Sequence, residues 1–145
     1  MPDWLTHSLT GWIIGKTWRK SISLVVVGTL LPDLVKIQLI FDFLNADTQH
    51  FFDALHTPIA TIFVALAIST LFPDIIEAFI LLYTGALSHY FLDFFLEHPY
   101  GGMRLLYPFS WNEYQIHLIP STNYWMTVVA IIIAIIFYVI FKNTE

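Results

Sequence analysis

A histidine and a carboxylate interrupt the largely apolar run from Ile75 to Leu96. His89 and Asp93 lie four residues apart, so on a helix their side chains project from the same face, one turn apart. Ionisable side chains at membrane depth commonly cost about 3 kcal/mol each and are usually functional. Imidazole nitrogens and carboxylate oxygens are ligands for Zn²⁺, Mn²⁺ and Fe²⁺. The pair therefore predicts a metal site.

More histidines and aspartates occur in segments that are far apart in the chain. Taken alone, each has a simple role: His7 is an interface residue, Asp33 satisfies backbone at a kink, and His56 precedes a helix cap. On the expected topology these residues and the His89–Asp93 pair all fall at one end of the helical bundle, a grouping that a shared site would require. The candidate metal ligands are His7, Asp33, His50, His56, His89, Asp93 and His98.

The chemistry expected of such a centre is hydrolysis. It would hold one to three divalent ions, with Zn²⁺ the first candidate and Mn²⁺ or Fe²⁺ the alternatives. Bound ions lower the pKa of water toward about 7 and clamp the oxygens of a phosphoester. His89 and Asp93 are then the candidate catalytic residues, and Arg104 is the candidate for binding the substrate's phosphate.

The composition indicates an integral membrane protein. Of the 145 residues, 57% are hydrophobic and only 12% are charged, against roughly 25% charged in a soluble domain. A soluble fold of this size could not bury so much apolar surface. The substrate is therefore expected to be a lipid or a lipid-linked headgroup. A net charge of −5 without a basic patch argues against nucleic acid, and the absence of cysteine excludes thiolate ligands.

The elements that must position these residues are helices. The patterns predict one all-α domain over residues 1–145, a bundle of about five helices of which four or five cross the membrane. Pro32 interrupts the second helix and is expected to kink it. The expected helices cover residues 3–18, 21–43, 57–72, 74–96 and 124–141.

The distribution of basic residues orients the expected bundle. Lys16, Arg19 and Lys20 lie between the first two helices, and Lys142 follows the last. If the first helix spans, the positive-inside rule places both positions on the cytoplasmic side of the cell membrane. The candidate site then faces the non-cytoplasmic side.

The ordered set of motifs resembles a known family. It comprises His7, Leu31-Pro32-Asp33, His56-Thr57, Ser88-His89-x-x-x-Asp93 and Gly101-Gly102-Met103-Arg104-Leu105-Leu106-Tyr107-Pro108-Phe109-Ser110. The set, which extends to about Trp111, resembles the membrane-bound metal-dependent hydrolases related to a LexA-binding inner-membrane protein. That family is similar to the zinc-dependent phospholipase C and single-strand nuclease superfamily, whose all-helical members hold clustered metal ions. The resemblance implies metal ligands at His7, Asp33, His56, His89 and Asp93.

Two departures from the family pattern reduce the expected number of ligands. Many members read His-Arg-Gly-x-Thr-His where this chain has His50-Phe-Phe-Asp-Ala-Leu-His56, and many have a second aspartate where this chain has Val35. Asp53, Glu97 and His98 are the candidates to replace the missing ligands.

Two other classes of function stay open at this point. Histidine and aspartate within membrane helices also serve as relays in metal or proton transporters. A metal held by a closed set of ligands would instead only join helices. The sequence leaves the substrate, the metal and the oligomeric state undetermined.

Overall fold

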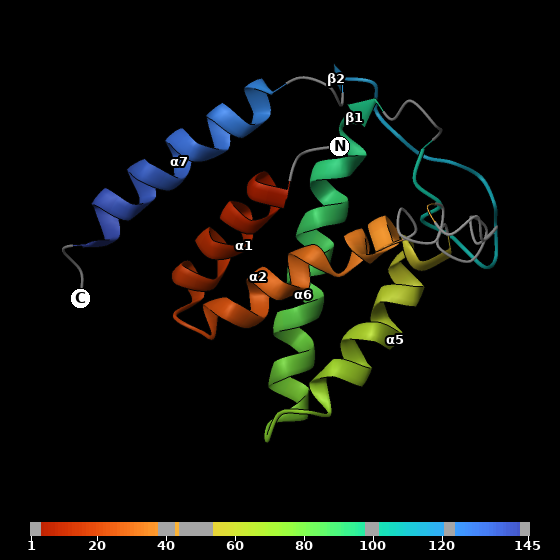
Figure 1. Cartoon of the computed structure of the whole chain (residues 1–145), viewed down its shortest axis with the longest axis horizontal. Helices are drawn as coiled ribbons and strands as arrows, with labels where there is room; N and C mark the ends of the chain where they lie inside the picture. Colours follow the sequence, from red (N-terminus) through yellow and green to blue (C-terminus); the bar gives the residue numbers. More distant parts are fainter. Residues whose placement is uncertain (1–3, 38–42, 44–53, 98–101, 121–123, 143–145) are drawn as a thin grey trace.

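In the computed structural model, residues 4–37, 43, 54–97, 102–120 and 124–142 are described. This part of the chain forms five α-helices, a 3₁₀ helix and one pair of two-residue strands (Figure 1). The all-helical fold predicted from the sequence is confirmed. The elements are α1 (Trp4–Trp18), α2 (Ile22–Leu30), η1 (Pro32–Ile37), α5 (Pro58–Ser69), α6 (Ile75–Phe94), β1 (Leu96–Glu97), β2 (Ile119–Pro120) and α7 (Trp125–Lys142).

Helix α6 lies at the centre and packs against α1, α2 and α5 (Figure 1). It begins at Asp74, whose carboxylate caps the helix by accepting a hydrogen bond of 2.9 Å from the Glu77 amide. Its buried residues recur at spacings of three and four, which places them along one side of the helix. They are Ala78, Leu81, Leu82, Gly85, Ala86, His89, Tyr90 and Asp93.

Glycines bring α2 and α6 into backbone contact. A Cβ at Gly28 would collide with the carbonyl oxygen of Leu82, and a Cβ at Gly85 would collide with the carbonyl oxygen of Val25. The same holds between α1 and α2, where a Cβ at Gly15 would lie 2.8 Å from the Cα of Ile22. Small residues at such crossings let helices approach closely, as in membrane bundles.

Helices α5 and α6 form the predicted antiparallel hairpin. Thr57 caps α5 by accepting a hydrogen bond from the Ala60 amide at 3.4 Å, and Pro58 occupies the first helical position. The turn at residues 70–74 then leads directly into α6. The sequence itself shows the cap residue followed by proline. The predicted start of this helix therefore agrees closely with the observed start.

Helix α2 ends where the sequence predicted only a kink. It stops at Leu30, and the chain continues as the 3₁₀ helix η1 from Pro32. Proline has no amide to donate and its ring clashes with the preceding turn, so the α-helical ladder cannot pass this residue. The helix expected over residues 21–43 is therefore confirmed as far as Leu30 and wrong as an α-helix over Pro32–Ile37, while residues 38–42 lie outside the described residues.

The segment between α6 and α7 returns to the end of α6. Strand β1 pairs in parallel with β2, and the Ile116 amide donates a hydrogen bond of 2.7 Å to the carbonyl oxygen of Phe94. Within the segment, Met103 and Tyr114 form an antiparallel bridge. Helix α7 then runs beside α1 at the edge of the bundle (Figure 1).

Two described helices, α6 with 20 residues and α7 with 18, are long and apolar enough to cross a membrane. Most side chains of α7 are exposed, including Ile132, Ile136 and Ile140, as expected for a surface in contact with lipid. The 12 residues of α5 span about 18 Å, less than the ~30 Å hydrocarbon core. The sequence predicted four or five membrane-spanning helices. The described part of the chain contains two candidate spans.

Candidate metal centre

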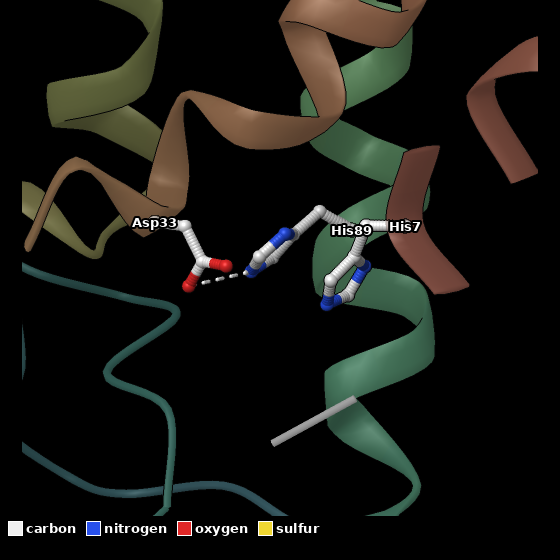
Figure 2. A group of neighbouring side chains, drawn as sticks. All are labelled: His7, Asp33 and His89. Carbon is white, nitrogen blue, oxygen red and sulfur yellow. Dashed lines mark ion pairs between the residues drawn. The ribbon is translucent and has the colours of Figure 1, made fainter. Parts of the chain in front are cut away.

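Five sequence-predicted ligands from four parts of the fold meet in one cluster. His7 comes from α1, Asp33 from η1, His56 from the residues before α5, and His89 and Asp93 from α6. Figure 2 shows His7, Asp33 and His89 converging. The structure therefore brings these five together as expected, at the end of α6 opposite its N-terminus. That they bind metal stays a prediction.

His89 lies at the middle of the cluster. Its Nε2 atom is 3.3 Å from Asp93 Oδ2, 3.3 Å from His56 Nε2 and 4.0 Å from Asp33 Oδ1. Two overlapping groups could each hold a metal ion, because their ligand atoms all lie within 4.8 Å of one another. One consists of His7, Asp33 and His89; the other consists of His56, His89 and Asp93.

The Asp93 carboxylate lies between the other two imidazoles. Its Oδ1 atom is 3.4 Å from His7 Nε2, and its Oδ2 atom is 3.8 Å from His56 Nε2. The ring of His7 stacks on the ring of His89, with centroids 3.8 Å apart and planes 16° from parallel. Oδ1 therefore faces His7, and Oδ2 faces His56 and His89.

A hydrogen bond to the backbone defines the tautomer of His89. Its Nδ1 is 2.8 Å from the carbonyl oxygen of Thr29, an atom that can only accept, so Nδ1 carries the proton. In the neutral ring, Nε2 then presents its lone pair to the carboxylates of Asp33 and Asp93. Histidine ligands in metal sites are characteristically held in this way by an acceptor behind the ring.

Burial makes any uncompensated charge in the cluster energetically costly. His7, Asp33, His89 and Asp93 are all buried, while the His56 side chain is 16% exposed. Neither ring nitrogen of His7 makes a hydrogen bond within the described part of the chain. Two buried carboxylates carry negative charge, which either protonated imidazoles or a divalent cation would offset. The donor set and its charge therefore fit a divalent transition metal.

Comparison with known proteins places the chain in a membrane family. The family model described as YdjM inner membrane protein matches residues 3–145. The chain belongs to the YdjM inner membrane protein family. No curated protein and no solved structure matches the chain. The YdjM match supports the predicted location in the inner membrane, and its description names neither hydrolysis nor a metal.

In this YdjM family member, Arg104 has a partner that the sequence did not reveal. Its guanidinium forms an ion pair of 3.2 Å with Glu113 and lies 5.5 Å from the centre of the Trp111 ring. Glu97 lies in β1 with its side chain exposed. The remaining candidates, His50, Asp53 and His98, lie outside the described residues.

Sequence reasoning missed a buried hydroxyl pair beside the cluster. Tyr90 and Thr61 share a hydrogen bond of 2.6 Å, and the Tyr90 ring lies 5.6 Å from His56 and 5.8 Å from His89 between ring centres. The pair connects α5 to α6 where the imidazoles meet. Tyr90 is not among the candidate site residues predicted from the sequence, although its position next to His89 was a usable signal.

Proposed function

We propose that this YdjM family member is a metal-dependent hydrolase of a phosphoester held at the membrane, such as a phospholipid or a lipid-linked headgroup. The observation that carries the proposal is the convergence of His7, Asp33, His56, His89 and Asp93 from four parts of the fold into one buried cluster. Buried ionisable groups without a function would be replaced by apolar residues at little cost.

The residues of the chain divide the work of such a site. His7, Asp33, His56, His89 and Asp93 would hold the metal, which when bound supplies Lewis acidity and an activated water. The Thr29 carbonyl orients His89 through its Nδ1 proton. His56, the partly exposed member of the five, would lie where the phosphoester approaches.

The surroundings of the cluster support the proposal of a lipid substrate. The centre lies towards the end of α6, a candidate membrane span whose side chains at Leu87 and Phe91 are exposed. A headgroup phosphate attached to acyl chains can reach such a position from the bilayer, whereas a fully hydrated phosphoester must leave water to do so.

A structural metal is the second candidate, and the burial of the cluster favours it. Four of the five side chains are at most 3% exposed. A site that only joins helices has its coordination positions filled by protein. The two functions therefore differ in whether hydrolysis accompanies metal binding.

The test compares the wild-type protein, purified in detergent, with Asp93→Asn and with His117→Gln as the matched control. His117 is an exposed histidine in the segment before β2, where it contacts Gln115. We expect a stoichiometric transition metal by elemental analysis and hydrolysis of phospholipid in mixed micelles. Asp93→Asn should lower both, with activity falling by at least about 100-fold, and His117→Gln should lower neither.

The outcomes separate the candidates. A stoichiometric metal without hydrolysis of any phosphoester offered would identify a structural site. Wild-type protein that takes up no transition metal from Zn²⁺, Mn²⁺ or Fe²⁺ would refute both functions.

A further inference from the structure

The segment of residues 102–118, here called the 102–118 loop, presents large apolar side chains to its surroundings. Phe109 is 88% exposed, Trp111 60% and Leu106 52%. Met103 is buried and fastens the loop through its bridge to Tyr114. The loop is therefore attached through a buried side chain at Met103, while the large apolar side chains of Leu106, Phe109 and Trp111 are exposed.

Part of the backbone at the tip of this loop is hydrogen-bonded within the loop. The Phe109 and Ser110 amides donate to the carbonyl oxygen of Leu106 at 2.8 and 3.1 Å, and the Tyr107 amide donates to that of Arg104 at 3.3 Å. The Asn112 amide donates to the Ser110 hydroxyl oxygen at 3.1 Å. Backbone that enters a medium of low polarity must be paired in this way.

The charged side chains of the loop neutralise each other. Arg104 and Glu113 form an ion pair of 3.2 Å, and Glu113 also accepts a hydrogen bond of 3.2 Å from the Gly102 amide. Within residues 102–118, Glu113 is the one acidic residue and Arg104 is the one arginine or lysine. The exposed apolar tip between them, residues 105–111, carries no charge.

The loop is fixed to the end of a candidate membrane span. The Ile116 and Leu118 amides donate to the carbonyl oxygens of Phe94 and Phe95, at 2.7 and 3.3 Å. The Phe95 ring packs against Phe91, which is exposed on α6. The loop leaves β1 and comes back to β2 at this same end of α6 (Figure 1). The exposed side chains of Ile116 and Leu118 therefore lie at the end of this span.

We infer that the 102–118 loop is an interfacial anchor whose apolar tip, centred on Phe109, inserts into the interfacial region of the lipid bilayer. The occupant of this exposed apolar tip is lipid, because hydrogen bonds fix the loop to the end of a candidate span in an inner-membrane family protein. Tryptophan beside phenylalanine and leucine is the composition of segments that lie in the interface. This role is independent of whether the buried cluster is catalytic.

The absence of cysteine allows a direct test. Phe109→Cys is labelled with an environment-sensitive nitrobenzoxadiazole dye, and the full-length protein is reconstituted into phospholipid nanodiscs. Asn112→Cys is the matched control in the same loop, Leu106→Cys is a second apolar position, and Ile132→Cys on α7 is the reference for lipid contact. Emission is quenched either by aqueous iodide or by nitroxide-labelled lipid.

We expect the labels at positions 106 and 109 to emit at shorter wavelength than the label at 112. Nitroxide lipid should quench the labels at 106 and 109 at least twofold more strongly than the label at 112. The quenching at 106 and 109 should be close to that at position 132. The inference is overturned if iodide quenches positions 109 and 112 equally. It is also overturned if neither quencher reaches 109, since protein would then cover the tip. Both apolar positions are exposed, so the substitutions leave the packed core unchanged.

Discussion

His89 joins the cluster because its two ring nitrogens have different partners. Nδ1 donates to the Thr29 carbonyl, and Nε2 faces Asp33, His56 and Asp93. The i, i+4 spacing of His89 and Asp93 predicted that these two would meet, and the structure places them 3.3 Å apart. The acceptor of the Nδ1 hydrogen bond is a main-chain carbonyl. Because every residue has such a carbonyl, the residue types in the sequence could not predict this contact.

At the same scale, Tyr90→Phe tests the hydroxyl pair beside the histidines. The change removes one partner of a buried hydrogen bond of 2.6 Å and leaves the Thr61 hydroxyl without it. We expect the free energy of unfolding to fall by about 1–2 kcal/mol, measured by denaturant or thermal unfolding in detergent. Tyr83→Phe, on the same helix but partly exposed, should change it by less than about 0.5 kcal/mol. Equal effects of the two substitutions would contradict this assignment.

At the scale of elements, Pro32 positions two parts of the site. By ending α2 it leaves the Thr29 carbonyl in the last turn, where the helix itself supplies few amides to satisfy it. It also opens the 3₁₀ helix that carries Asp33 toward His89 (Figure 2). The end of α2 at this point is therefore needed for the cluster to form.

Pro32→Ala should separate metal affinity from stability. Alanine restores an amide and favours continuation of α2, which draws the Thr29 carbonyl into the helical ladder and moves Asp33. We expect Zn²⁺ affinity to fall about 10-fold or more with no loss of thermal stability, as measured by competition with a chromogenic chelator. Pro73→Ala, in the turn between α5 and α6, is the control and should bind Zn²⁺ like wild type. Wild-type affinity in Pro32→Ala would argue against this role.

At the scale of the whole molecule, the cluster and a peripheral ion pair occupy opposite ends of the bundle. Lys20 and Glu77 pair at 2.6 Å across the α1–α2 turn and the first turn of α6. The hydrogen bond to Glu77 is the main cause that raises the pKa of Lys20. Glu77 and Asp93 are 16 residues apart on one helix, which corresponds to about 24 Å. The buried cluster joins side chains from α1, η1, α6 and the residues before α5, so metal binding and folding should be coupled.

Chelation should therefore destabilise the whole protein. Metal present at about 1,000 times its dissociation constant adds about 4 kcal/mol to the free energy of unfolding, so removal should lower Tm by roughly 10 °C. The measurement is thermal unfolding in detergent with and without EDTA, with EDTA presaturated by Zn²⁺ as the control. His89→Gln, which lacks the residue shared by both ligand groups, should not respond to EDTA. An equal EDTA effect on this variant would show that the chelator acts elsewhere.

Local signals in the sequence were sufficient for several features of the structure. The cap residue Thr57 before Pro58 predicted the start of α5, and long apolar runs with few charges predicted α6 and α7. The types and order of five histidines and aspartates predicted a common cluster, and these residues do lie together. These features were predictable because capping, periodicity and burial cost act on neighbours in the chain.

By itself the sequence determined that the chain is helical and membrane-associated, and which side chains could serve as ligands. Only the tertiary structure decided that α2 ends before Pro32, that Arg104 pairs with Glu113, and that the Thr29 carbonyl holds His89. The physical reason is that composition and period report burial and local geometry. Contacts between distant segments depend on how closely helices approach, as at Gly28 and Gly85, and on main-chain atoms common to every residue.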